Sequence, residues 1–244
     1  MIRLSLVAGL ILPIMLWAAG APAAEFTPAQ RAEIVGIVRD ALKQDPSILR
    51  DAITALQADD GAQAAAATRA AIVQAKGQLV TAADPMAGNA HGDVTIVEFF
   101  DTRCPYCRKM EPTMESFLSQ DRKVRLVYKD LPILGPASVL GAKALLAAQK
   151  QGAYLPMREA VMQLPPDTTL PQIEAVARRL GLDWVRMQRD MDDPSVQARI
   201  DANLKLAHAL GIEGTPALVI GDNLVPGAVD LPDLEKAVAE ARKG

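Results

Sequence analysis

Apolar positions from residue 84 onward predict four strands. Val94 to Phe100 is an almost unbroken apolar run, and residues 124–129 alternate, so both segments are typical of strands in a sheet. Residues 217–220 and 224–226 predict two shorter strands on either side of a glycine-containing turn.

Elsewhere in this part of the chain, apolar residues recur at helical spacing. The predicted helices span 109–118, 137–151, 154–163, 170–180, 184–191, 194–210 and 231–242. The order is strand, helix, strand, a block of helices, two strands and a final helix. This order predicts a small mixed sheet interrupted by a helical insertion at about 136–210.

Residues 26–80 differ in character from the rest of the chain. Thr27-Pro28-Ala29-Gln30 predicts a helix start with a capping box and a proline at the first helical position. Asp45-Pro46 ends this helix and begins a second, because proline disrupts a helix interior. Alanine dominates residues 58–76, and Gly77 is the predicted C-cap.

The helices of this segment carry stripes of apolar side chains. The segment is too short and too rich in alanine to bury these stripes by folding on itself. The stripes consist of Ile34, Val35, Ile37, Val38, Leu42, Ile48, Leu49, Ala52, Ile53 and Leu56. One heptad position is apolar throughout, with Val35, Leu42, Leu49 and Leu56 seven residues apart, but its companion position is only half apolar, with Val38, Asp45, Ala52 and Asp59. This pattern does not support a long coiled coil. We therefore expect residues 26–57 to form an oligomerisation arm. The alternative is that these helices fold back onto the main domain.

The first residues have the pattern of an export signal. Arg3 precedes an apolar run that ends at Ala19, and Ala21-Pro22-Ala23 is a small-residue cleavage pattern. We expect cleavage after Ala23, with Ala24 as a close alternative, and a periplasmic mature protein. An uncleaved membrane anchor is the competing interpretation.

The charge of the chain argues against nucleic acid as a partner. The formal net charge is −3, and loss of Arg3, the only charge in residues 1–23, makes it −4. No basic stripe with interleaved aromatic residues accompanies this acidic balance.

Cys104-Pro105-Tyr106-Cys107 lies between a predicted strand and a predicted helix, and it contains the only two cysteines of the chain. Thiols three residues apart at a helix start face the same way, so they can form and open a small disulfide. The helix N-terminus favours a thiolate at Cys104, which predicts thiol–disulfide exchange. A purely structural disulfide is the weaker interpretation, because so short a loop restricts the unfolded chain little.

Three segments together resemble a known family: Phe99 to Cys107, Tyr128 to Gly135, and Gly214-Thr215-Pro216-Ala217. They look like the DsbA-like family of thioredoxin-fold proteins over residues 84–244. Residues 26–57 are similar to the helical arm of ScsC-type proteins. The resemblance implies an α/β protein: a thioredoxin-like fold with an inserted helical domain over 81–244, preceded by an N-terminal helical arm over 24–80. It also implies that the arm forms a trimer.

The resemblance implies roles for the matching residues. Cys104 would be the exposed nucleophile, and Cys107 the more buried resolving cysteine. Pro216 would be a cis proline facing the disulfide, although an ordinary trans proline at an edge strand is the alternative. The extended backbone of Thr215 would pair with a substrate strand. Pro105 and Tyr106, between the cysteines, would also contact the substrate.

Glu98 lies six residues before Cys104, where thioredoxin-like proteins carry a buried acid. Its strand neighbours are apolar, so burial would raise the pKa of its carboxyl and let it accept a proton from Cys107. The alternatives are a surface acid and an ion-pair partner of Lys129.

The Pro-Tyr pair between the cysteines departs from DsbA, which has Pro-His there. Tyrosine cannot supply an imidazolium, so positive charge at the thiolate would come from the helix amides and from Arg103, Arg108 and Lys109. An ordinary solvated face is the alternative interpretation of these three cations.

No pattern indicates a bound metal. His91 and His208 are the only histidines, and their spacing from the cysteines is not that of a tetrahedral site. Met110 and Met114 are expected in the core. The cysteine pair alone could bind a soft ion such as Cu(I).

We therefore predict an exported thiol:disulfide oxidoreductase, a disulfide isomerase or oxidase. Its substrates would be unfolded or misoxidised exported proteins, and it would exchange electrons with a membrane redox partner of unknown identity. It would need no cofactor. Two other interpretations stay open: a copper-binding or copper-tolerance protein with the cysteines as ligands, and a glutaredoxin-like reductase, because Cys-Pro-Tyr-Cys also occurs in glutaredoxins.

Overall fold

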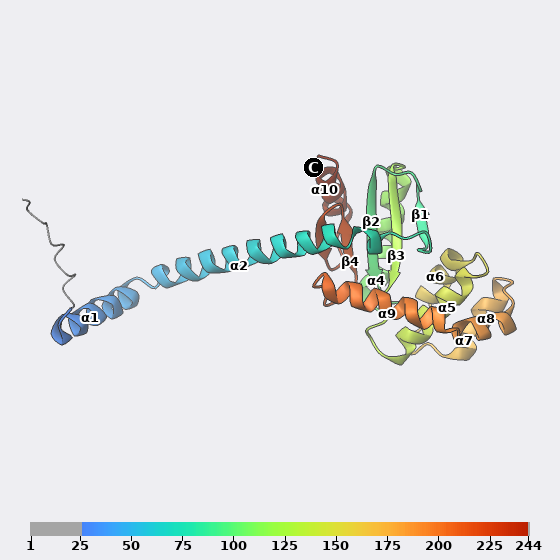
Figure 1. Cartoon of the computed structure of the whole chain (residues 1–244), viewed down its shortest axis with the longest axis horizontal. Helices are drawn as coiled ribbons and strands as arrows, with labels where there is room; N and C mark the ends of the chain where they lie inside the picture. The colour runs from blue at the N-terminus through green and yellow to red at the C-terminus, as the bar shows by residue number, and fades with distance from the viewer. Residues whose placement is uncertain (1–25, 244) are drawn as a thin grey trace, which may run out of the picture. The chain divides into compact units, whose positions relative to one another are not determined.

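The computed structural model describes residues 26–243, so the predicted signal peptide and its cleavage site lie outside the described residues. Internal contacts group the described chain into two compact units, 26–58 and 59–243 (Figure 1). The division lies earlier in the chain than the predicted boundary after residue 80. The reason is the packing of the last turns of the alanine-rich segment.

The first unit contains α1 (Pro28–Gln44) and the beginning of α2 (Ser47–Gln74). The predicted capping box is present, since the Thr27 hydroxyl accepts from the Gln30 amide at 3.3 Å and the Gln30 side chain accepts from the Thr27 amide. The predicted break also occurs, because α1 ends at Asp45, whose carboxylate accepts from the Ser47 amide at 3.0 Å. α1 therefore begins and ends, and α2 begins, as the sequence predicts.

The alanine-rich segment continues α2 to Gln74 and leads into the short helix α3 (Lys76–Leu79). Ile72 and Leu79 are buried in the core of the second unit, which is why this unit begins before residue 80. Gly77 lies inside α3, so its predicted role as a C-cap is wrong.

The second unit is built on a five-stranded sheet in the order β1-β3-β2-β4-β5. The strands are β1 (Met86–Gly88), β2 (Val94–Phe100), β3 (Val124–Asp130), β4 (Ala217–Ile220) and β5 (Asn223–Pro226). The pair β2 and β3 is parallel and the other pairs are antiparallel. The sequence analysis missed only β1, whose three residues are too few for a periodic signal.

Helices cover both faces of this sheet, which explains why β2 is an almost unbroken apolar run. Ile96 packs into a core with α4 (Pro105–Gln120) and the helical insertion, whereas Val97 packs on the opposite face with α3 and α9 (Pro194–Ala209). The remaining helices are α5 (Pro136–Gln149), α6 (Tyr154–Met162), α7 (Leu170–Arg179), α8 (Trp184–Met191) and α10 (Leu231–Ala241).

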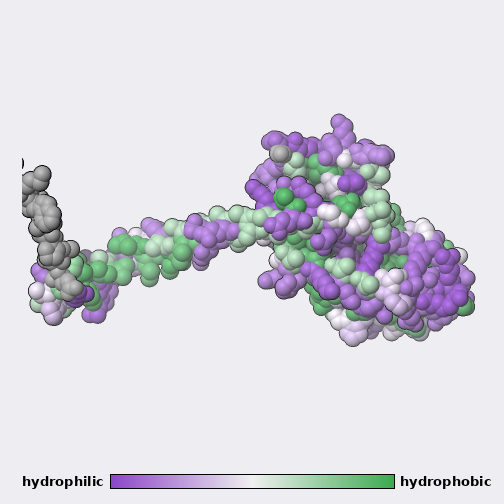
Figure 2. Space-filling view, viewed as in Figure 1, coloured by the Kyte–Doolittle hydropathy of each residue, from purple (hydrophilic) through white to green (hydrophobic). Residues whose placement is uncertain are grey.

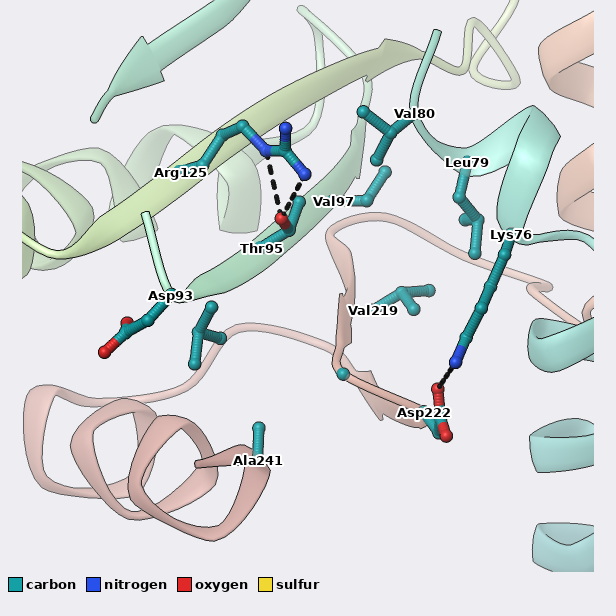
Figure 3. A pocket seen from close by; sticks show the side chains of 12 residues that line it. Lys76, Leu79, Val80, Asp93, Thr95, Val97, Arg125, Val219, Asp222 and Ala241 are labelled. Carbon is teal, nitrogen blue, oxygen red and sulfur yellow. Dashed lines mark hydrogen bonds and ion pairs between the residues drawn. The ribbon is translucent and has the colours of Figure 1, made fainter. Parts of the chain in front are cut away.

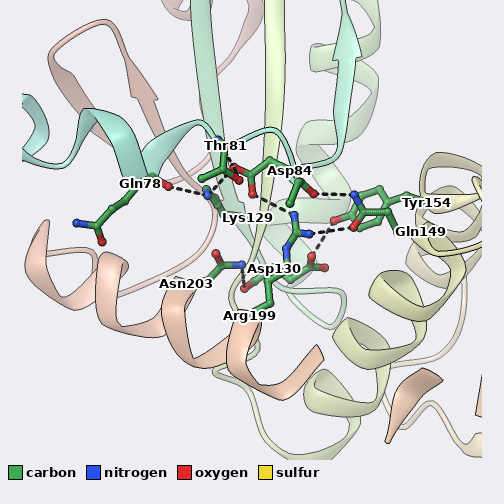
Figure 4. A network of polar contacts seen from close by, with 10 residues as sticks. Gln78, Thr81, Asp84, Lys129, Asp130, Gln149, Tyr154, Arg199 and Asn203 are labelled. Atoms are coloured by element: carbon green, nitrogen blue, oxygen red, sulfur yellow. Dashed lines mark hydrogen bonds and ion pairs between the residues drawn. The ribbon is translucent and has the colours of Figure 1, made fainter. Parts of the chain in front are cut away.

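A buried polar network joins the sheet to the segment before β1 and to the insertion (Figure 4). The Lys129 ammonium pairs with Asp84 at 2.8 Å and donates to the Gln78 carbonyl at 2.8 Å. Arg199 of α9 pairs with the other Asp84 oxygen at 3.0 Å. Lys129 therefore uses Asp84, and the predicted alternative of a Glu98–Lys129 pair does not occur.

A cavity of about 320 Å³ opens at the start of β2, the end opposite to the cysteines (Figure 3). Arg125 on its wall donates twice to the Thr95 hydroxyl, at 3.0 and 2.7 Å, and Lys76 pairs with Asp222 at 3.0 Å. Across residues 26–243, no helix combines the length and the apolar character needed to cross a bilayer.

Candidate redox site

The two cysteines lie where β2 passes into α4. Cys104 is the N-cap residue of α4 and Pro105 occupies the first turn, where its missing N–H costs no helical hydrogen bond. Cys107, three residues after Cys104, lies in the same first turn and faces the core. Both thiols are free.

Asp101 holds the turn before Cys104 in place. One oxygen of its buried carboxylate accepts from the Arg103 amide at 2.8 Å, and the other accepts from the amides of Ile133 and Leu134 at 2.9 and 3.0 Å. Its carbonyl accepts from the Cys104 amide at 3.0 Å. Asp101 therefore joins the cysteine turn to the loop after β3, a role that the sequence analysis did not identify.

The Cys104 thiol lies against the loop before β4. Its Sγ donates to the Thr215 carbonyl at 3.1 Å, and the Thr215–Pro216 bond is cis, as predicted. Cys104 is 4% exposed and Cys107 is 0% exposed. The predicted order of exposure is therefore right, but the expectation of an openly exposed Cys104 is wrong, because the Thr215 loop covers it.

Tyr106 is the exposed residue of the motif, with 62% of its surface open to solvent. Pro105 is also exposed, and Thr215 is partly exposed. A partner that reached Cys104 would thus meet Tyr106 on one side and the Thr215 backbone on the other.

The thiols differ in their environment. Burial raises the pKa of the Cys107 thiol, and the nearby Cys104 and Glu98 raise it further, against a lowering hydrogen bond from the Asp101 backbone. Cys104 instead lies at the start of α4, where the helix dipole stabilises an anion. The arrangement favours attack by Cys104 and leaves Cys107 dependent on a proton acceptor.

Two of the predicted cations hold loops together. Arg108 donates to the Thr102 carbonyl at 3.1 and 2.8 Å and to the Leu164 carbonyl at 2.7 Å. Arg103 donates to the carbonyls of Leu134 and Pro166. These two side chains are therefore not a simple solvated face, whereas Lys109 is exposed.

Helix α5 approaches the cysteine turn closely at Gly141. A Cβ at this position would overlap the Thr102 side chain, so glycine is required for the contact. The insertion is in this way packed directly against the redox site.

Glu98 is buried in β2, which contradicts the interpretation as a surface acid. Burial raises the pKa of its carboxyl to about 7, Arg158 lowers it and Glu111 raises it. Neither carboxyl oxygen has a hydrogen-bond partner among the described residues. Both oxygens are thus free to take a proton.

Arg158 of α6 is the charged partner of Glu98, and sequence reasoning missed it. Its guanidinium lies 3.5 Å from Glu98 and donates to both oxygens of Glu111, at 2.5 and 2.6 Å. It also lies between two rings, 4.4 Å from the centre of Phe100 and 4.2 Å from that of Tyr128. One sequence signal could have identified Arg158, namely a charged residue on an otherwise apolar helix face. Met157 and Val161 on either side of it are buried.

The described residues contain no group of three or more histidine, cysteine, aspartate or glutamate side chains that could hold a metal ion. His91 and His208 are exposed. Met110 and Met114 are buried in the core, as predicted.

Two family matches divide the chain in the same way as the predicted resemblance. Residues 95–239 match the DSBA-like thioredoxin domain, and residues 30–63 match the copper resistance protein ScsC N-terminal domain. The predicted resemblance and the predicted thioredoxin-like fold with its helical arm are thereby confirmed.

Solved structures agree with this assignment. A thioredoxin-like oxidoreductase from Silicibacter pomeroyi is 43% identical, with a TM-score of 0.65 over 67% of this chain and 95% of its own. ScsC of Proteus mirabilis in a transitional conformation is 32% identical, with a TM-score of 0.65 over 89% of this chain and 97% of its own.

Curated relatives include a disulfide-exchange protein and membrane antiporters. The thiol:disulfide interchange protein DsbA of Bordetella parapertussis is 27% identical over 69% of this chain and 83% of its own length. The chain also matches Na(+)/H(+) antiporters named NhaA, of whose length it spans about a quarter.

Proposed function

The chain belongs to the DsbA-like thioredoxin family of thiol:disulfide oxidoreductases, and from this premise we propose that it reshuffles disulfides in unfolded or misoxidised exported proteins of the periplasm. The observation that carries the proposal is the Cys104 thiol at the start of α4, 3.1 Å from the Thr215 carbonyl. A nucleophilic thiol next to the partly exposed Thr215 fits a polypeptide substrate. A relative titled a periplasmic thioredoxin-like protein, from Salmonella enterica, supports the location.

The exchange proceeds through a mixed disulfide. The Cys104 thiolate attacks a substrate disulfide, forms an S–S bond to one substrate sulfur and releases the other as a thiolate. Cys107 then attacks Cys104, so the cysteine pair is oxidised and the substrate is reduced by two electrons. Alternatively a second substrate thiol attacks first, which leaves the substrate isomerised and Cys104 free. Running the first route backward oxidises a substrate.

The Thr215 backbone positions the substrate. It lies in the bend directly before β4, and a substrate strand would pair with it by main-chain hydrogen bonds. Tyr106 and Pro105, which are exposed at the start of α4, would contact the same substrate strand. Such binding would recognise the main chain of the substrate and not its side chains. This property suits an enzyme that acts on many unfolded proteins.

Glu98 accepts the Cys107 proton. A carboxyl with a pKa of about 7 can take and return a proton near neutral pH. Glu98 is close enough to Cys107 to influence the pKa of its thiol, and the proton would pass between the two groups directly or through water. The burial that raises the Cys107 pKa makes this acceptor necessary.

The arm joins several copies, most simply as a trimer. The described apolar side chains of α1 and early α2 are exposed, for example Ile37 at 62% and Leu56 at 61%. Figure 2 shows hydrophobic residues on the surface of these helices. Isolated helices of this kind gain most of their stability by packing an apolar face. Linked active sites would hold one substrate at high effective concentration, which favours isomerisation over simple oxidation.

The test measures two properties of the mature protein. One is the redox equilibrium of the cysteine pair with glutathione, and the other is recovery of activity by a scrambled-disulfide substrate. We expect a readily reducible pair and efficient refolding. A pair that neither exchanges with glutathione nor refolds the substrate would remove the proposal. An oxidising pair with little refolding would assign an oxidase that passes electrons to a membrane partner.

Copper binding is a second candidate because residues 30–63 match a domain named for copper resistance. The cysteine pair would supply the two soft ligands for Cu(I). Titration of the reduced protein with Cu(I) tests it. One tightly held ion per chain, together with absence of disulfide exchange, would replace the oxidoreductase assignment.

A further inference from the structure

Helix α6 of the insertion reaches two buried carboxyls with one face. Tyr154 and Arg158 are four residues apart, so they lie on the same side of the helix. The Tyr154 hydroxyl donates to Asp130 at 3.0 Å, at the end of β3. Arg158 lies 3.5 Å from Glu98 in the adjacent strand β2. The insertion thereby supplies polar partners to both parallel strands.

Arg158 is built into its place. The residue is 4% exposed, and its guanidinium is held between Phe100 and Tyr128 and by two hydrogen bonds to Glu111. Its contact with Glu98 is longer than a hydrogen bond. The positive charge of Arg158 therefore acts on the Glu98 carboxyl, but Arg158 donates no hydrogen bond that would hold Glu98 permanently in its carboxylate form.

We propose that Arg158 is a positioning residue for the redox reaction, which keeps Glu98 able to release and regain the proton of Cys107. The inference rests on the proposed function, because it deepens the role given there to Glu98. It makes the helical insertion part of the acid–base machinery, since the cation comes from α6 and not from the strands or from α4.

The groups that face Glu98 come from every element packed around it. Arg158 lies on α6, Glu111 and Cys107 on α4, and Tyr128 on β3. The register partner on β4 is the apolar Leu218. Arg158 lowers the Glu98 pKa and Glu111 raises it, so the two variants below should move it in opposite directions.

The step affected is resolution of the mixed disulfide. The Cys107 proton moves to the Glu98 carboxylate, and the Cys107 thiolate attacks Cys104. The bond between Cys104 and the outer sulfur breaks, the Cys104–Cys107 bond forms, and the outer thiolate leaves with the electron pair. Glu98 then returns the proton to solvent or to the leaving thiolate.

The experiment follows two releases of coloured thionitrobenzoate when the reduced mature protein meets 5,5′-dithiobis(2-nitrobenzoate). The first release reports attack by Cys104, and the second reports resolution by Cys107. We expect the second rate of the wild type to rise with pH through an inflection near the Glu98 pKa of about 7. In Arg158→Met the inflection should move to higher pH, and resolution at a pH below it should slow about tenfold for each pH unit that the inflection moves.

A Glu98→Gln background separates positioning from folding. There Arg158→Met should change the second rate by less than about twofold, since the group on which it acts is gone. Equal slowing in both backgrounds, or a wild-type profile for Arg158→Met alone, would overturn the inference. Tyr154→Phe, on the same helix face but bonded to Asp130, is the matched control and should keep the wild-type inflection.

If Arg158→Met fails to fold, the variant Glu111→Gln tests the same inference, because it should shift the inflection in the opposite direction. Glu111 is partly exposed, and its neutralisation leaves Arg158 facing Glu98 alone. The inflection should then move down, and resolution below pH 7 should become faster. An unchanged or raised inflection would overturn the inference. A wild type that shows no second release would instead defeat the proposed function itself.

Discussion

Two pairs of leucines, one in each unit, have the same helical pattern in the sequence but differ in burial. Leu145 and Leu146 of α5 are buried at 0% and 3% exposure, whereas Leu49 and Leu56 of α2 are 54% and 61% exposed. Both pairs lie within helical patterns in the sequence. Periodicity therefore identifies which face of a helix is apolar, but the partner that covers this face has to come from elsewhere. In the arm we assign that partner to other copies of the chain.

The strongest test of this division removes the chemistry and leaves the arm intact. Cys104→Ser should reduce disulfide exchange to the uncatalysed background, because we propose the Cys104 thiolate as the nucleophile. Cys107→Ser should still attack and should accumulate mixed disulfides, which non-reducing electrophoresis detects. The mass of both variants in solution should equal that of the wild type. Turnover by Cys104→Ser would reverse the assignment of the cysteines.

The reciprocal change removes the arm and keeps the chemistry. Deletion of residues 26–57 from the mature chain should convert the oligomer to a monomer in light scattering. Isomerisation of a scrambled substrate should fall about tenfold or more through loss of effective concentration, while oxidation of a simple dithiol peptide stays within about twofold. A wild type that is already monomeric would refute the arm, and an equally active monomeric truncation would refute its purpose.

Single leucines should respond according to their unit. Leu145→Ala should lower the free energy of unfolding of the catalytic unit by about 2–5 kcal/mol, because it leaves a cavity. Leu49→Ala should change it by less than about 0.5 kcal/mol and weaken assembly instead. Urea unfolding followed by Trp184 fluorescence reports the catalytic unit. Equal losses in the two variants would show that the arm packs on its own chain.

The smallest expected effect is a pH dependence of the free energy of unfolding that arises from Glu98 in the catalytic unit. The raised pKa of Glu98 means that the folded chain binds a proton more tightly than the unfolded chain does. Its contribution is fully present below about pH 4.5 and is lost as the pH rises to about 7, by at most about 3 kcal/mol. Glu98→Gln should therefore gain stability over the wild type between pH 5 and pH 8 in urea unfolding. A constant difference would contradict the raised pKa.

The sequence predicted features that depend on local spacing. The capping box at Thr27, the break at Asp45-Pro46 and the strand before Cys104 all have short-range signals, and all occur. The cis bond before Pro216 and the thioredoxin-like fold followed from the family resemblance. Glu98 could be placed in the interior because an acid within an apolar strand is conspicuous.

Features made by distant segments could not be predicted. Between Glu98 and Arg158 the chain passes through α4, β3 and α5, and nothing in the strand that holds Glu98 specifies its partner. Burial of Cys104 depends on the Thr215 loop, which lies 111 residues later. Lys129 pairs with Asp84 because the segment before β1 returns to β3, a contact without a local pattern. Tertiary packing determines these three contacts. The sequence offers a single indication of them, which is a charged residue among apolar neighbours.

The carboxylate of Asp101 has a consequence for local opening of the chain. The amides of Arg103, Ile133 and Leu134 all donate to this single side chain. When it leaves, all three lose their acceptor together, although one belongs to the cysteine turn and two to the loop that leads into the insertion. Their exchange with deuterated solvent is thus governed by one shared event. The cysteine turn and the entrance to the insertion open as a single piece.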